Sequence, residues 1–188
     1  NWTEIANLNT ARASGAGAGA NNSSGIFFGG NDGSSDLAIN ESYNGSNWTE
    51  VNDLNTARNY VSGIGTATSA LAFGGASPSP TGVTEVWNGT NWTEVADLNT
   101  ARTRSGGAGT DSTSALAYGG SAPAISALTE SWNGSSWTET TNISTARNSG
   151  GSSGIATAAL YSGGQNPSGK LATTEEFTGP GAGVTVTF

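Results

Sequence analysis

The sequence predicts an all-β protein made of four repeated units, and three observations support this. A segment that opens with Trp and ends in Thr-Ala-Arg occurs four times, about 45 residues apart, with Trp2, Trp48, Trp92 and Trp137 at its start and Arg12, Arg58, Arg102 and Arg147 at its end. A pair of glycines follows each Arg, beginning at Gly29, Gly74, Gly119 and Gly163. No segment shows a sustained period of 3.6 residues, which disfavours helix.

Composition excludes several classes of function. The 188-residue chain has no Cys and no His, so disulfides, thiol nucleophiles, imidazole bases and zinc-finger sites are ruled out. Six Lys and Arg against 14 Asp and Glu, a net charge of −8, disfavour a nucleic-acid partner. No apolar run reaches the ~20 residues of a membrane span, so we expect no membrane insertion. We also expect no metal and no cofactor.

Strand signals follow one another in the same order in each unit. After Arg comes a stretch of small residues, such as 14–20, and then a short apolar strand that the glycine pair ends, such as 24–28. A loop of variable length leads to the third strand, which carries Glu-x-aromatic. Asn-Gly then indicates a hairpin with positive φ at both turn positions. The strand that begins with Trp pairs back as the fourth.

Four antiparallel strands repeated four times are typical of a β-propeller. We therefore predict one domain over residues 1–188, with units at about 1–46, 47–90, 91–135 and 136–188. The strand of Gly and Ala is expected innermost, where backbones approach closely. The aromatic side chains are expected to fill the wedges between blades.

The pattern resembles kelch repeats, which share the glycine pair after the second strand, the aromatic residue in the third strand and the Trp in the fourth. Only five residues separate the aromatic residue from Trp, as from Tyr43 to Trp48, so the hairpin is tighter than in kelch repeats. The Asn-, Thr-, Ser- and Gly-rich style also resembles kelch-like repeats of phage and marine bacterial structural or surface proteins, tail fibres among them.

Closure of the ring leaves two alternatives. Residues 1–5 form a complete fourth-type strand with no unit before it, whereas Ala182 stands where the last unit should have Trp. We expect residues 1–5 to latch the last blade, leaving Val184, Val186 and Phe188 for a further edge strand or for self-association. In the converse, the tail completes that blade and Trp2 is the remnant of an upstream blade. Four blades per chain is the first choice, and two chains forming eight blades is the alternative.

Candidate site residues lie where the units differ. The recurring Arg, Trp and Gly anchors are expected to be structural, because a residue needed at one site rarely occurs in every unit. The loops after the glycine pairs and before the second strands diverge, which favours recognition there. The candidate ligand-binding residues are Asn31, Asp32, Asp36, Asp111, Asn166 and Lys170. Calcium binding by the first three is the less favoured interpretation.

These features predict a non-enzymatic recognition or structural module that presents variable loops to a glycan or protein, outside a cell or on a virion. One alternative is an assembly element that latches subunits through terminal strands. A second alternative is a glycan-cleaving enzyme, which would need two carboxylates about 5–9.5 Å apart.

Overall fold

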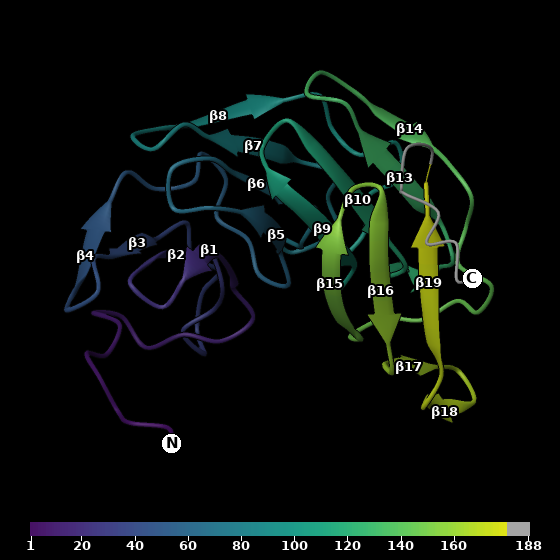
Figure 1. Cartoon of the computed structure of the whole chain (residues 1–188), viewed down its shortest axis with the longest axis horizontal. Helices are drawn as coiled ribbons and strands as arrows, with labels where there is room; N and C mark the ends of the chain where they lie inside the picture. Colours follow the sequence, from purple (N-terminus) through teal and green to yellow (C-terminus); the bar gives the residue numbers. More distant parts are fainter. Residues whose placement is uncertain (180–188) are drawn as a thin grey trace, which may run out of the picture.

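The computed structural model describes residues 1–179 and confirms an all-β, four-bladed β-propeller. The sheets follow one another around an arc from blade 1 at the left of Figure 1 to blade 4 at the right. Blade 1 contains β1 (Ala16–Asn21), β2 (Ser24–Phe28), β3 (Asn40–Tyr43) and β4 (Trp48–Val51). Blade 2 contains β5 (Ser62–Gly65), β6 (Ala70–Phe73), β7 (Thr84–Trp87) and β8 (Trp92–Val95).

The second half of the chain repeats this order. Blade 3 contains β9 (Gly106–Asp111), β10 (Ser114–Tyr118), β13 (Thr129–Trp132) and β14 (Trp137–Glu139). Blade 4 contains β15 (Gly151–Ile155), β16 (Ala158–Ser162) and β19 (Thr174–Thr178), and these form a three-stranded sheet within residues 1–179. Small hairpins follow the last two glycine pairs: β11 (Ser121–Ala122) with β12 (Ala124–Ile125), and β17 (Gln165–Asn166) with β18 (Gly169–Lys170).

Each sheet is an antiparallel meander whose first strand lies innermost. This alternation places the loops after the second strands on one face of the propeller, here called the loop face (residues 29–39, 74–83, 119–128 and 163–173). The opposite hairpin face carries the turns between the third and fourth strands, at residues 44–47, 88–91 and 133–136.

The Asn-Gly hairpins form where the sequence predicts them, but their geometry differs. Gly45 has a φ of 93°, whereas Asn44 is not among the residues with positive φ. The Asn44 side chain instead accepts hydrogen bonds from the amides of Ser46 and Asn47, at 3.0 and 2.9 Å. An Asn side chain that holds the turn removes the need for left-handed backbone at its own position.

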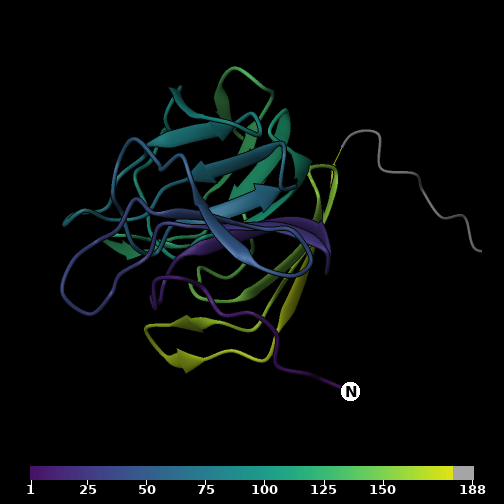
Figure 2. The same cartoon turned by 90° about the vertical axis from the view of Figure 1, so that its left-hand side faces the viewer.

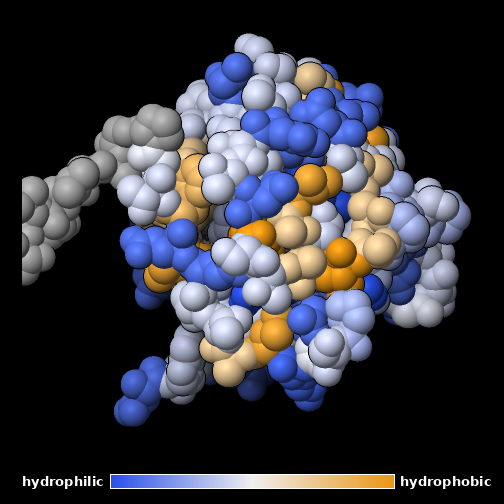
Figure 3. All heavy atoms as spheres, turned by 90° about the vertical axis from the view of Figure 1, so that its right-hand side faces the viewer, coloured by the Kyte–Doolittle hydropathy of each residue, from blue (hydrophilic) through white to orange (hydrophobic). Residues whose placement is uncertain are grey.

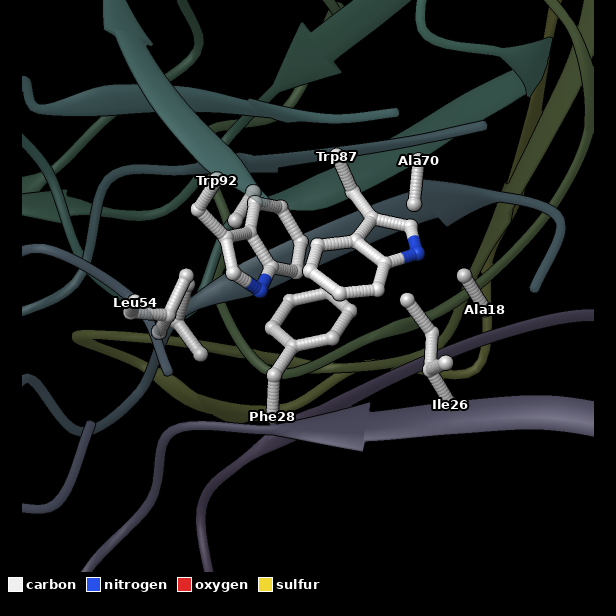
Figure 4. Close-up of a cluster of buried hydrophobic side chains, with 9 residues drawn as sticks. Ala18, Ile26, Phe28, Leu54, Ala70, Trp87 and Trp92 are labelled. Carbon is white, nitrogen blue, oxygen red and sulfur yellow. The ribbon is translucent and has the colours of Figure 1, made fainter. Parts of the chain in front are cut away.

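Aromatic side chains fill the spaces between consecutive blades. Phe28 of blade 1 meets Trp92 of blade 2 edge to face, with ring centroids 4.8 Å apart, and Leu54 and Trp87 complete the cluster (Figure 4). Equivalent buried clusters lie between blades 2 and 3 and between blades 3 and 4. The chain has few large aliphatic residues, and these rings supply the buried apolar area instead.

The glycine pairs tie each blade to the next one. The amide of Gly75 donates to the carbonyl of Arg102 at 2.9 Å, and Gly120 donates to Arg147 at 2.8 Å. Gly74 approaches the same carbonyl so closely that a Cβ atom there would lie 2.5 Å from the Arg102 oxygen. Both glycines of the pair also have positive φ, so no other residue type fits this junction without strain.

The innermost strands of blades 1 to 4 pack side by side in order, and they are rich in small residues as predicted. At Gly63 a Cβ atom would lie 2.5 Å from Phe28 Cζ and 2.9 Å from Ala16 Cβ. Gly17 is the same unit position in blade 1, where the nearest atom to a Cβ would be the Ile26 oxygen at 3.5 Å.

Gly63→Ala is therefore expected to lower the free energy of unfolding by about 1–3 kcal/mol, because the new methyl group overpacks the junction of blades 1 and 2. Gly17→Ala is the matched control and is expected to leave the stability unchanged or slightly raised, since the unfolded chain loses entropy. Urea unfolding of both variants checks this. Equal losses at the two positions would contradict the account.

The predicted latch of residues 1–5 onto the last blade is not formed in this structure. Residues 1–8 belong to no strand, and Trp2 is fully exposed. In Figure 2 the purple start of the chain extends beyond the sheets. The tail positions of the alternative, Ala182, Val184, Val186 and Phe188, lie outside the described residues.

Candidate functional site

The structure distributes the sequence-predicted ligand residues over separate places. Asn31, Asp32 and Asp36 lie on the loop face of blade 1. Asp111 ends an inner strand on the hairpin face, where its carboxylate accepts from the amide of Thr113 at 2.8 Å. These sets therefore lie on opposite faces and cannot share a ligand. Asn166 and Lys170 lie on the loop face of blade 4, in the β17–β18 hairpin.

The three residues of blade 1 are engaged in local structure. Asp36 accepts from the side-chain amides of Asn31 and Asn59, at 2.9 and 2.6 Å, and so joins blades 1 and 2. Asp32 accepts from the amides of Ser34 and Ser35, both at 2.8 Å. The bonds from Ser35 and then Ser34 lower the pKa of Asp32. Residues 1–179 contain no group of three or more His, Cys, Asp and Glu that could hold a metal ion.

The recurring Arg residues each form an ion pair with the Glu of the same unit. The bond from Arg58 Nη1 to Glu85 Oε1 is 2.8 Å and that from Arg102 Nη2 to Glu130 Oε1 is 2.6 Å, with all four side chains inaccessible to solvent. Arg147 pairs with Glu175 at 2.7 Å, and Arg12 pairs with Glu41. The expected structural role of these residues agrees with this geometry.

The residues just before each Arg also donate hydrogen bonds to the carboxylate of the paired Glu. Glu85 Oε2 accepts from both the amide and the side chain of Asn55, at 2.7 and 2.8 Å. At the equivalent Glu41, burial raises the pKa, but hydrogen bonds from Arg12, Asn9 and Thr10 outweigh it and leave that pKa below the ordinary 4.5. Desolvation lowers the pKa of Arg58. These guanidinium groups are sequestered and cannot bind an external anion.

One position of the repeat, two residues after each Arg, adopts left-handed backbone without being glycine. Its occupants are Ser14, Tyr60, Arg104 and Ser149, with φ values of 59°, 49°, 54° and 56°. Positive φ is uncommon for any residue with a side chain and unusual for one as large as Tyr or Arg. Residues in such backbone regions cluster at active sites, ligand clamps and switch regions.

These four positions surround the propeller axis at the loop-face end of the inner strands. The Arg104 amide donates to the Tyr60 carbonyl at 3.2 Å, and the Ser149 amide donates to the Arg104 carbonyl at 3.1 Å. A cavity of about 240 Å³ opens between them. We call this cavity and the four side chains the axial site.

A stacked Tyr and Arg pair dominates the axial site. The Arg104 guanidinium carbon lies 3.8 Å from the centroid of the Tyr60 ring. Hydrogen bonding to Arg104 and then its charge lower the pKa of Tyr60 below the usual 10. Among residues 1–179, Arg104 and Lys170 are the basic side chains that form no ion pair. Arg104 thus places an uncompensated positive charge at the axis.

Hydroxyl groups make up much of the remaining wall. They belong to Ser14, Ser62, Ser105, Ser149 and Ser152, and no carboxylate of residues 1–179 lines the cavity. Ser62 Oγ lies 2.8 Å from both the carbonyl oxygen and Oγ of Ser105. A fixed cation on an aromatic ring, surrounded by hydroxyls, can bind an anionic group and hydrogen-bond the polar atoms around it.

Sequence reasoning missed the axial site. The signal was present, since the position two residues after the recurring Arg varies as Ser, Tyr, Arg and Ser between otherwise similar units. The prediction favoured the variable loops instead, because they are longer than this single varying position. Only the structure shows that four residues about 45 positions apart converge on one axis.

Comparison with known proteins adds no family. No protein-family model matches the chain, and no curated protein matches it. Within residues 1–179 there is no helix with the length and apolar character needed to cross a bilayer.

Proposed function

We propose that the protein is a non-enzymatic recognition module that binds an acidic glycan at the axial site. The observation that supports this most directly is Arg104, held by strained backbone against Tyr60 at the mouth of a hydroxyl-lined cavity. A carboxylate or sulfate on a sugar would pair with the guanidinium, and the sugar hydroxyls would bond to the surrounding serines.

A glycan fits this site better than a protein surface does. The cavity is concave and small, at about 240 Å³, whereas a stable protein interface buries roughly 800 Å² on each partner. Binding without cleavage is favoured because the cavity is lined by no Asp or Glu, and glycoside hydrolysis needs a pair of carboxylates.

The proposal includes a kelch-like character of the units and a place on a virion or cell surface. Supporting the first are the glycine pair after β2, the aromatic residue in β3 and the Trp of β4, which recur in this order. Supporting the second are the abundance of Ser, Thr and Asn and the scarcity of Lys.

Arg104→Ala is expected to weaken binding of an acidic oligosaccharide by about tenfold to a hundredfold, the cost of one charge-assisted hydrogen bond. Calorimetric titration should use sulfated and uronate-containing oligosaccharides, with neutral ones of the same length for comparison. Lys170→Ala removes the other unpaired cation and is expected to leave the affinity unchanged.

Tyr60 supplies an independent readout in the same experiment. A bound anion offsets the charge of Arg104, so the Tyr60 pKa should rise toward its ordinary value, and Arg104→Ala alone should raise it as well. Absorbance of the tyrosinate measures both shifts. Equal binding of neutral sugars, or release of reducing ends on long incubation, would refute the proposal.

A further inference from the structure

The fourth-strand Trp of a blade occupies a defined slot against the blade before it. Trp137 of blade 3 packs edge to face on Phe73 of blade 2, at 5.2 Å, and on Trp132 of its own blade at 5.4 Å. Its indole nitrogen donates to Thr84 Oγ1 at 3.1 Å. Leu98 completes the buried cluster. The slot of Trp137 thus combines an aromatic wall, a hydroxyl acceptor and a Leu.

Between blades 3 and 4 the equivalent slot is a cavity of about 320 Å³. Its lining includes Tyr118, Thr129, Ile143 and Phe177, which stand at the unit positions of Phe73, Thr84, Leu98 and Trp132. Thr129 Oγ1 is buried and has no hydrogen-bond partner within residues 1–179. Thr84 accepts the indole proton of Trp137 from the equivalent unit position. The cavity therefore contains the hydrogen-bond acceptor that a Trp side chain would use.

The walls of the cavity remain formed without a Trp. Tyr118 and Tyr161 meet edge to face at 5.0 Å, and burial raises the pKa of each phenol. Figure 3 views the blade 4 end of the molecule, where orange apolar side chains reach the surface. Leu160 at this end keeps 44% of its surface exposed.

The chain itself contains the side chain that fits. Residues 1–5 read Asn-Trp-Thr-Glu-Ile, matching Asn-Trp-Thr-Glu-Val at 47–51 and 91–95, yet Trp2 is fully exposed. In blades 1 to 3 the Trp pairs directly with the aromatic residue of the third strand, as Trp92 does with Trp87. Phe177 of β19 is the third-strand aromatic without such a partner in the described chain.

Residues 1–179 contain no blade to which residues 1–5 could belong. Asn9 and Arg12 bind Glu41 of blade 1, just as Asn55 and Arg58 bind Glu85 of blade 2. Asn55 and Arg58 follow β4, the Trp strand of blade 1, and they bind Glu85 of the next blade, blade 2. By the same rule, residues 1–5 are the Trp strand of a blade that adjoins blade 1. Blades 1 and 4 of the same chain meet only around the axial site, because β1 and β15 are not among the strand pairs that pack together and no buried cluster joins them among residues 1–179.

Figure 1 agrees, since the chain start lies beside blade 1 and β19 lies at the other end of the arc. The two ends of the arc also carry complementary backbone groups for the hydrogen bond that joins consecutive blades. The Gly164 amide makes no hydrogen bond within residues 1–179, and the Arg12 carbonyl, its acceptor by analogy with Gly120 and Arg147, accepts none there.

We propose that residues 1–5 of one copy add as a fourth strand to β19 of a second copy and insert Trp2 into the cavity lined by Tyr118, Thr129 and Phe177. The contact joins unlike surfaces, so copies associate head to tail and stop growing where the rotation closes. The axial site takes no part in this contact.

Sedimentation velocity over a range of protein concentrations tests the proposal. The chain is expected to associate reversibly, and Trp2→Ala should abolish association or weaken it at least tenfold. Trp2 contacts nothing that holds the monomer together, so the variant should fold and keep its axial-site binding. A chain that stays monomeric at all concentrations, or a Trp2→Ala variant that associates like the parent, overturns the proposal.

A matched pair of threonine variants separates association from folding. Thr129→Val removes the unpartnered acceptor and is expected to weaken association by about tenfold with little change in Tm. Thr84→Val removes the acceptor of Trp137 and is expected to lower Tm without changing association. If Thr129→Val leaves association unchanged, the indole does not occupy this cavity.

Quenching of Trp2 fluorescence shows whether residues 1–5 add to a second copy or fold back on their own chain. Burial of Trp2 that increases with concentration supports insertion into a second copy. Burial of Trp2 in a monomer at every concentration means that the strand folds back on its own chain, and overturns the proposal.

Discussion

Glu85→Ala is expected to destabilise the protein by about 3–5 kcal/mol, a large part of the 5–15 kcal/mol typical of a folded domain. The carboxylate is buried and accepts from Arg58, from the amide and side chain of Asn55 and from the amide of Thr56. Its removal leaves the buried Arg58 guanidinium without a counter-charge and two or more donors without acceptors. Urea unfolding measures the loss.

The control for this variant lies on the neighbouring strand. Glu94 pairs in register with Glu85 but is exposed to solvent. Glu94→Ala is expected to change the stability by no more than about 0.5 kcal/mol. If both variants lose the same stability, the effect reflects total charge and not the buried pair.

Trp137→Ala is expected to cost about 3–5 kcal/mol, the usual range for removing a large buried aromatic side chain. Trp137 fills the wedge between blades 2 and 3, and its loss would leave Phe73 and Trp132 facing a void and Thr84 without its donor. Because the Trp joins two blades, its removal should reduce their cooperative unfolding. Calorimetry and urea unfolding both report this.

Trp48 is the matched position in blade 1, and the described residues provide no blade before it. It is half-buried and contacts Tyr43 at 5.1 Å. Trp48→Ala, measured in dilute monomer, should cost only about 1 kcal/mol. A loss equal to that of Trp137→Ala would show that the Trp acts within its own blade and not between blades.

Much of the architecture could be predicted because each unit repeats the same local rules. The glycine pair, the Asn-Gly turn and the Trp strand are short-range signals, and their order along the chain is the order of strands in a blade. The predicted latch of residues 1–5 failed because closure depends on the angle between blades. That angle is set by side-chain packing, such as Phe28 against Gly63, which a residue pattern does not encode.

The candidate site was less accessible to sequence reasoning. Divergent loops suggested Asn31, Asp32 and Asp36, but Asp36 bonds to Asn59 across the blade junction and Asp111 lies on the other face. Tyr60 and Arg104 differ in type and stand 44 positions apart, so no local pattern joins them. Their contact exists because the arc turns both toward one axis.

The sequence alone was sufficient to determine the repeat, the all-β class and the use of aromatic residues such as Trp92 and Trp137 between blades, since these follow from local turn chemistry and from side-chain size. The tertiary structure decided which residues meet at the axis and which slot between blades is left unfilled by residues 1–179. Both depend on the relative placement of separate sheets, and distance along the chain carries no information about that placement.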